Sequence, residues 1–253
     1  MTGEDNILLA RLHDAVLNAG KRQFPAFLGF LNEHEISVAL RYINSGAVTV
    51  NYRFFGGCDG SERCFLAIAG KGVDIEDYYF PISAICIRYK KDFKLSHRDF
   101  LGSLMGLGIK RETVGDILIS DGYAVVFVKS DVEKYILSQL TKIGSVGVDV
   151  SLWDGSTLLP IDKKIIEVNI PVASARLDSV VSAVYPLSRE RSAAAIRQGL
   201  VFVNGISADS VSRTVKPGDK ISVRGNGKFL VSDFFGTTKK GRLKLTVEKY
   251  LKE

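Results

Sequence analysis

The stretch RLDSVVSAVYPLSRERSAAAIRQGLVFVNG, residues 176–205, decides the fold of the last third of the chain. Its first part predicts a short helix with one apolar face, because large apolar residues recur at the spacing i, i+3, i+4 and i+7. These residues are Leu177, Val180, Val181 and Val184. Pro186 interrupts the pattern and is expected to end the helix.

The rest of the stretch predicts a second helix, a strand and a turn. Ser188 is a favourable N-cap, and Gly199 stands where a left-handed residue commonly follows a helix. The apolar run 200–203 is typical of a strand, and Asn204 with Gly205 is a strong signal for a type I′ hairpin turn.

Arginines are concentrated on the second predicted helix, at Arg189, Arg191 and Arg197, with Gln198 at its end. One interpretation is an ordinary solvated basic face. The other is a phosphate-binding face, because the guanidinium fork matches the oxygens of a phosphate group. The residues alone leave both interpretations open.

The order and spacing of these motifs resemble the alpha-L, or S-four-type, RNA-binding domain. The similarity includes the opening Arg-Leu-Asp at 176–178, Ser-Arg at 188–189, Gln-Gly-Leu-Val at 198–201, Val-Asn-Gly at 203–205 and Val-Lys-Pro-Gly-Asp at 215–219. In that family the two helices and the following hairpin bind RNA. The resemblance implies this role for Arg176, Arg189, Arg191, Arg197, Gln198 and Asn204.

The charge of the chain supports this assignment. Residues 1–80 carry a net charge of −3, residues 81–170 carry +1, and residues 171–253 carry +8. A basic final third favours a nucleic-acid partner. We therefore add further residues of this region to the predicted RNA-binding set: Ser188, Lys216, Arg224, Lys228, Lys239, Lys240 and Arg242.

The remaining sequence predicts two smaller domains, so the expected fold class is α+β with three domains. Residues 1–80 read as an α/β unit of two helices and a hairpin with strands at 47–55 and 63–69. Residues 81–170 read as β-α-β-β-α-β, the order of ferredoxin-like and RNA-recognition domains, with the second helix expected over 131–144 and the last strand over 146–153. Residues 171–253 form the RNA-binding domain.

The middle of the chain resembles the YlmH family, bacterial proteins encoded among cell-division-associated genes. The similarity lies in FFGG at 54–57, Glu-Arg at 62–63, HRDFLGSLMGLGIKRE at 97–112 and GDIL at 115–118. It implies a ribosome-associated protein that binds ribosomal RNA and tRNA on large subunits carrying stalled peptidyl-tRNA, in ribosome-associated quality control. Arg98, Lys110 and Arg111 in this stretch are candidates for a second RNA contact, against the alternative of an ordinary polar loop.

Two alternatives from other classes remain: an RNA-modifying enzyme of the pseudouridine-synthase type, and a ribosome-assembly factor. The Arg-Leu-Asp of 176–178 matches the motif around the catalytic aspartate of the former, but it opens the RNA-binding domain itself, so we expect no catalysis. We expect no cofactor, since the sequence has no convincing glycine-rich turn after a strand and no nucleotide-binding signature. We expect no metal, since Glu33, His34 and Glu35 are adjacent and splay around a helix.

The sequence also bears on location and assembly. It has no apolar run long enough for a membrane span and no signal-peptide pattern. Its three cysteines form no Cys-x-x-Cys pair and are typical of reduced thiols. We expect a cytoplasmic monomer.

Overall fold

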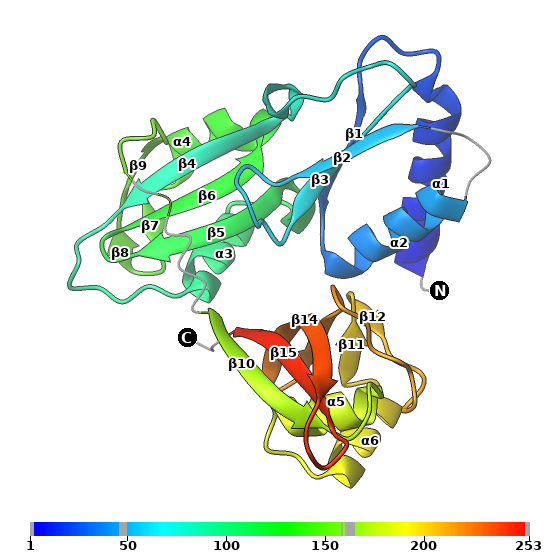
Figure 1. Cartoon of the computed structure of the whole chain (residues 1–253). Coiled ribbons are helices and arrows are strands. Elements are labelled where there is room, and N and C mark those ends of the chain that lie inside the picture. The colour runs from blue at the N-terminus through cyan, green and yellow to red at the C-terminus, as the bar shows by residue number, and fades with distance from the viewer. Residues whose placement is uncertain (1–2, 46–49, 158, 160–164, 251–253) are drawn as a thin grey trace. The chain divides into compact units, whose positions relative to one another are not determined.

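A computed structural model describes residues 3–45, 50–157, 159 and 165–250 (Figure 1). The chain divides into two compact units, residues 1–161 and 162–253. Among the described residues, no helix is both long and apolar enough to cross a lipid bilayer. The α+β fold class is confirmed, and each unit builds its own sheets and its own apolar core.

The first part of unit 1 is a three-stranded sheet with two helices. Strand β3 lies between β1 and β2, and all three are antiparallel neighbours. The elements are α1 (Gly3–Ala19), β1 (Ala26–Leu31), α2 (Glu33–Ser45), β2 (Asn51–Phe55) and β3 (Cys64–Ala69). Part of the strand predicted over 47–55 lies outside the described residues. Asn32 caps α2: Glu35 N–H donates to Asn32 Oδ1 (3.0 Å), and Asn32 N–H donates to Glu35 Oε2 (2.7 Å).

The second part of unit 1 has the predicted β-α-β-β-α-β order. Its sheet runs β5-β6-β4-β9, entirely antiparallel, with helices α3 and α4 against its core. The elements are β4 (Ile82–Arg88), α3 (His97–Gly106), β5 (Val114–Ser120), β6 (Tyr123–Lys129), α4 (Glu133–Gln139), β7 (Lys142–Ile143), β8 (Val146–Gly147) and β9 (Asp149–Leu152), with 3-10 turns η1 (Asp77–Tyr79), η2 (Arg111–Thr113) and η3 (Ser130–Val132).

Two boundaries in this part were predicted wrongly. The helix expected over 131–144 is only α4, because Leu140 leaves the helix in extended conformation and Ile143 enters the β7-β8 hairpin. Both side chains are buried in the same core, so the apolar pattern that suggested a longer helix is satisfied by a hairpin instead. The strand expected over 146–153 is correspondingly split into β8 and β9.

The two parts of unit 1 share one aromatic core, although the sequence predicts two separate domains here. Phe30 of β1 and Phe65 of β3 pack edge to face at 4.6 Å, and Phe127 of β6 and Phe80 belong to the same cluster. The first sheet buries side chains on both faces, since α1 and α2 cover one and this cluster covers the other. All six residues of β3 are accordingly buried.

Unit 2 is a six-stranded antiparallel sheet in the order β10-β15-β14-β13-β11-β12. Helices α5 and α6 share a core with one face of it (Figure 1). The elements are β10 (Ile165–Val172), α5 (Leu177–Val184), α6 (Arg189–Arg197), β11 (Val201–Val203), β12 (Ile206–Ser207), β13 (Lys220–Val223), β14 (Gly227–Thr237) and β15 (Leu243–Tyr250). Both helices and the turn at Asn204 and Gly205 agree with the sequence prediction. Strand β10 was missed, so the expected boundary at residue 170 falls inside it.

Candidate RNA interface

A buried carboxylate joins the two helices of unit 2. Asp178, in the first turn of α5, is only 4% exposed. It accepts hydrogen bonds from Arg176 Nε (3.1 Å) and from Arg189 Nε (3.0 Å). The side chains of Arg176 and Arg189 nevertheless remain 43% and 56% exposed. We call this arrangement the Asp178 clamp: it fixes two guanidinium groups side by side while both still face solvent.

The electrostatics of the clamp favour an ionised carboxylate. Burial alone would raise the pKa of Asp178, but the hydrogen bonds and positive charges of Arg176 and Arg189 outweigh it, so the pKa lies below its usual value. The carboxylate therefore stays charged at physiological pH. It cancels part of the repulsion between the two arginines, which would otherwise drive them apart.

Helix α6 carries the other predicted arginines. Ser188 Oγ accepts the Arg191 N–H at 3.2 Å, which confirms Ser188 as the N-cap. Arg191, Arg197 and Gln198 are exposed, whereas Ile196 is buried against the sheet. The helix is therefore amphipathic, with its cations on the solvent side.

The Asn204 side chain has a structural role that the resemblance did not suggest. Asn204 and Gly205 have φ of 53° and 74°, as the predicted type I′ turn requires. The Asn204 amide donates to Asp219 Oδ1 (2.9 Å) and accepts the Lys220 N–H (2.8 Å). Asp219 also accepts the Lys216 N–H (2.8 Å), so the side chains of Asn204 and Asp219 connect two turns by hydrogen bonds. The Lys216 side chain is exposed to solvent.

A hairpin tip presents three more predicted cations, Lys239, Lys240 and Arg242, all exposed. The tip is ordered by Thr238, whose N–H donates to the Arg242 carbonyl (2.7 Å) and whose Oγ1 accepts the Arg242 N–H (3.1 Å). Leu243, just after the tip, pairs with Val172 at the end of β10, shortly before Arg176. The tip therefore lies at the end of the sheet where α5 begins (Figure 1).

Arg224 and Lys228 lie elsewhere, at the opposite end of the β14-β15 hairpin. The Arg224 guanidinium carbon is 5.1 Å from the centre of the Phe202 ring, and Lys228 Nζ is 5.0 Å from the centre of the Tyr250 ring. Phe202, Tyr250 and Lys220 were not among the predicted RNA-binding residues, because only the strand register shows that they lie beside Arg224 and Lys228. The cations predicted to bind RNA therefore lie at both ends of the β14-β15 hairpin, with Arg224 and Lys228 at one end and the hairpin tip at the other.

The candidate second contact in unit 1 is only partly available. Arg98 and Lys110 are exposed. The Arg111 side chain instead turns inward, where its Nη1 donates to the Val114 carbonyl, and burial lowers its pKa. One N–H donor of the Arg111 guanidinium therefore stabilises this loop, and an RNA contact of Arg111 stays a prediction.

The glycine and arginine motifs of the YlmH resemblance build the junction inside unit 1. Asp116 accepts the Glu62 N–H (2.6 Å) and the Arg63 N–H (3.1 Å). Arg63 Nη2 donates to the Phe30 carbonyl at 2.7 Å. A Cβ atom on Gly57 would lie 2.2 Å from the Phe127 ring, so only glycine fits there. These residues hold the two sheets together.

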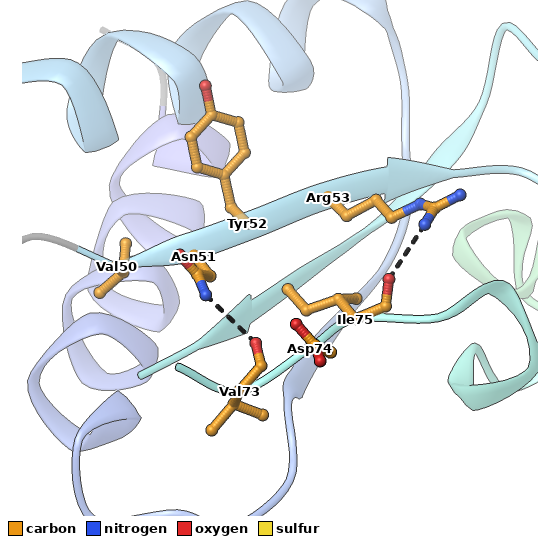
Figure 2. A pocket seen from close by; sticks show the side chains of 7 residues that line it. All are labelled: Val50, Asn51, Tyr52, Arg53, Val73, Asp74 and Ile75. Atoms are coloured by element: carbon orange, nitrogen blue, oxygen red, sulfur yellow. Dashed lines mark hydrogen bonds between the residues drawn. The ribbon is translucent and has the colours of Figure 1, made fainter. Parts of the chain in front are cut away.

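Unit 1 also has an open groove along its edge strand β2. Figure 2 shows an open groove beside β2 in which Asn51 Nδ2 donates to the Val73 carbonyl (3.2 Å) and Arg53 Nη1 to the Ile75 carbonyl (3.0 Å). These bonds hold a loop over the edge strand, which protects it from pairing with another chain. Within the described ranges, no three His, Cys, Asp or Glu side chains gather as metal ligands would, and His34 pairs with Asp5 at 2.8 Å.

Comparison with known proteins finds one matching family in each of the two units. Residues 175–221 match the S4 domain, and residues 75–155 match a family described as "Putative RNA-binding domain in YlmH". Unit 2, with its clamped arginines and its S4 domain, places the chain in the class of RNA-binding proteins. The chain is 33% identical over 209 residues to the ribosome-associated protein quality control protein P2 of Bacillus subtilis, covering 81% of this chain and 80% of that one. It belongs to the YlmH family.

A solved structure shows the same fold over part of the chain. The cell division protein ylmH from Streptococcus pneumoniae superposes with a TM-score of 0.51 at 22% identity, covering 60% of this chain and 93% of that one. At this identity the likeness concerns the fold alone. It agrees with the mixed α/β architecture described above.

Proposed function

We propose that this protein is a non-catalytic RNA-binding protein that docks on ribosomal RNA and tRNA through unit 2. The observation that carries the proposal is the Asp178 clamp, which holds Arg176 and Arg189 together and half exposed. With the exposed cations of the hairpin tip at the same end of the sheet, it forms a surface suited to the phosphates of folded RNA.

The clamp also supports a binding role over catalysis at the Arg-Leu-Asp motif. A catalytic aspartate must reach its substrate, but Asp178 is 4% exposed and both of its oxygens accept hydrogen bonds from arginines. A pseudouridine synthase would need this carboxylate open to a base. Because the Asp178 carboxylate already accepts hydrogen bonds from two guanidinium groups, RNA binding without catalysis is the favoured function.

The ribosomal partner is proposed from the family. The Bacillus subtilis relative is named as a ribosome-associated quality control protein. We propose that this chain acts likewise in the cytoplasm, as a monomer, on large subunits carrying stalled peptidyl-tRNA. Arg98 and Lys110 are exposed in the region 75–155 that matches the YlmH family, and they would give a further contact to RNA.

Sedimentation of the tagged full chain from a bacterial lysate tests this proposal, with the bound RNA sequenced. We expect the protein on large subunits together with tRNA, and loss of both from the Arg189→Ala/Arg197→Ala variant. Binding to immature subunits without tRNA would instead favour an assembly factor. A wild-type protein that stays at the top of the gradient without RNA would refute the proposal.

A further inference from the structure

The sheet of unit 2 has a second face that α5 and α6 do not cover. Alternate residues along each strand point to opposite faces. Ile221 and Val223 of β13 enter the core with the helices, so Lys220 and Ser222 point away from it. By the same alternation Phe202 of β11, whose neighbours in the strand are both buried, lies on the open face.

Strand register places one row of side chains across this open face. Phe202 pairs with Ser222, Ser222 pairs with Lys228, and the next strand places Tyr250 beside Lys228. Phe202 and Tyr250 are thus separated by three strand spacings, or about 14 Å. The row contains two aromatic rings with polar and cationic side chains between them.

Each ring in this row has a cationic partner. Arg224 lies over Phe202, with 5.1 Å between the guanidinium carbon and the ring centre. Lys228 and Lys220 lie 5.0 Å and 5.9 Å from the centre of the Tyr250 ring. The acidic residues of this face lie in neighbouring rows, not in the aromatic row: Glu248 stands opposite Leu230 and Glu167, and Asp233 stands opposite Thr246. The aromatic row is therefore positively charged.

Aromatic rings interspersed with cations suit a particular ligand. Proteins bind single-stranded RNA by stacking unpaired bases on aromatic side chains or guanidinium planes while cations contact the backbone phosphates. A duplex, whose bases are already stacked, cannot use the rings in this way. A flexible lysine beside a ring can turn to a phosphate when a base occupies the ring face.

We propose that the open face of the unit 2 sheet is a stacking site for unpaired RNA bases, with Phe202 and Tyr250 as the platforms and Lys220, Arg224 and Lys228 as phosphate contacts. It extends the proposed RNA binding to a face separate from the Asp178 clamp. Lys228 and Tyr250 lie beyond residue 221, where the match to the S4 domain ends. The protein would then bind a structured RNA through α5 and α6 and an unpaired segment through the sheet.

The test is a fluorescence anisotropy titration of the full chain with two labelled RNAs, a short single-stranded oligoadenylate and a stable RNA hairpin. We expect Phe202→Leu and Tyr250→Leu each to weaken oligoadenylate binding about tenfold and to leave hairpin binding unchanged. Arg189→Ala should do the reverse. An oligomer of the same length with abasic positions should bind the wild type as weakly as the normal oligomer binds the variants.

The outcomes separate this site from the proposed function. If both leucine variants, shown by circular dichroism to be folded, bind oligoadenylate like the wild type, the stacking site is refuted whatever the sedimentation experiment gives. Equal affinity for the abasic oligomer also refutes it, because that result leaves only charge. Arg224→Gln provides a second variant at an exposed position, and we expect it to weaken oligoadenylate binding severalfold.

Discussion

At the scale of single residues, Asp178 determines how the helix pair presents its positive charge. The resemblance assigned Arg176 and Arg189 to RNA binding, and the structure adds the carboxylate that holds both of them. Without it, two neighbouring guanidinium groups would repel each other and sample many rotamers. Fixing them before binding lowers the entropy cost of contacting phosphates.

We predict that Asp178→Asn lowers the free energy of unfolding by about 2 kcal/mol, because a charged hydrogen-bond acceptor of two arginines is lost from a buried position. Urea unfolding measures this change, with the exposed Glu190→Gln as the control.

The effect of Asp178→Asn on stability should depend on pH. Since the pKa of Asp178 is lowered, its contribution is fully present above about pH 4, the usual carboxyl range, and is lost as pH falls through the lower pKa of the folded state. A difference between wild type and variant that stays constant down to strongly acidic pH would contradict the clamp.

A substitution of Asn204 distinguishes a structural role of this residue from a role in RNA binding. We predict that Asn204→Gly, which tolerates the positive φ, destabilises the protein by about 1 kcal/mol through loss of the bonds to Asp219 and Lys220. The RNA affinity of the folded protein should not change, because no RNA contact is lost. Urea unfolding and an RNA titration check the two parts. Weaker RNA binding with unchanged stability would restore Asn204 as an RNA contact.

At the scale of elements, α6 depends on its first turn. Ser188→Ala removes the cap on the Arg191 N–H and should cost about 1 kcal/mol of stability. The turn that carries Arg189 and Arg191 should also fray, so RNA affinity should fall. Ser188→Asn, an equally good cap, should restore both quantities. If the alanine variant matches the wild type in thermal unfolding and in RNA titration, the cap is unimportant.

The elements of unit 2 were largely predictable because each has a local signal. Ser188, Gly199 and the Asn204-Gly205 turn bracket short elements, and the structure places all three as expected. Strand β10 was missed because most of its side chains are exposed and its partner strand β15 is far away in the sequence. The end of α4 was misjudged because Leu140 and Ile143 fit the spacing of a buried helix as well as that of a hairpin.

At the scale of the whole molecule, the sequence could not show that residues 1–80 and 81–161 form one unit. Their shared core is made of phenylalanines from β1, β3 and β6, none of which is unusual within its own segment. The motifs of the YlmH resemblance identified the family correctly. Several of them, including Gly57 and Arg63, hold the junction between the two sheets.

We predict that Asp116→Ala destabilises unit 1 by on the order of 2 kcal/mol, since it leaves the N–H groups of Glu62 and Arg63 without their acceptor. Because the chain divides into two compact units, RNA binding by unit 2 should be unaffected. Thermal unfolding followed by RNA titration at low temperature tests both statements, with the exposed Asp92→Ala as control. An unchanged melting profile would show that the junction does not depend on Asp116.

The central claim is that unit 2 binds RNA through phosphate contacts of named arginines. The most direct test measures the affinity of the full chain for large-subunit ribosomal RNA across a range of salt concentrations, for the wild type, Arg189→Ala, Arg197→Ala and the exposed control Lys21→Ala. We predict that the slope of log affinity against log salt falls by about one for each arginine removed and is unchanged for Lys21→Ala. Slopes equal to the wild type in both arginine variants would contradict the account.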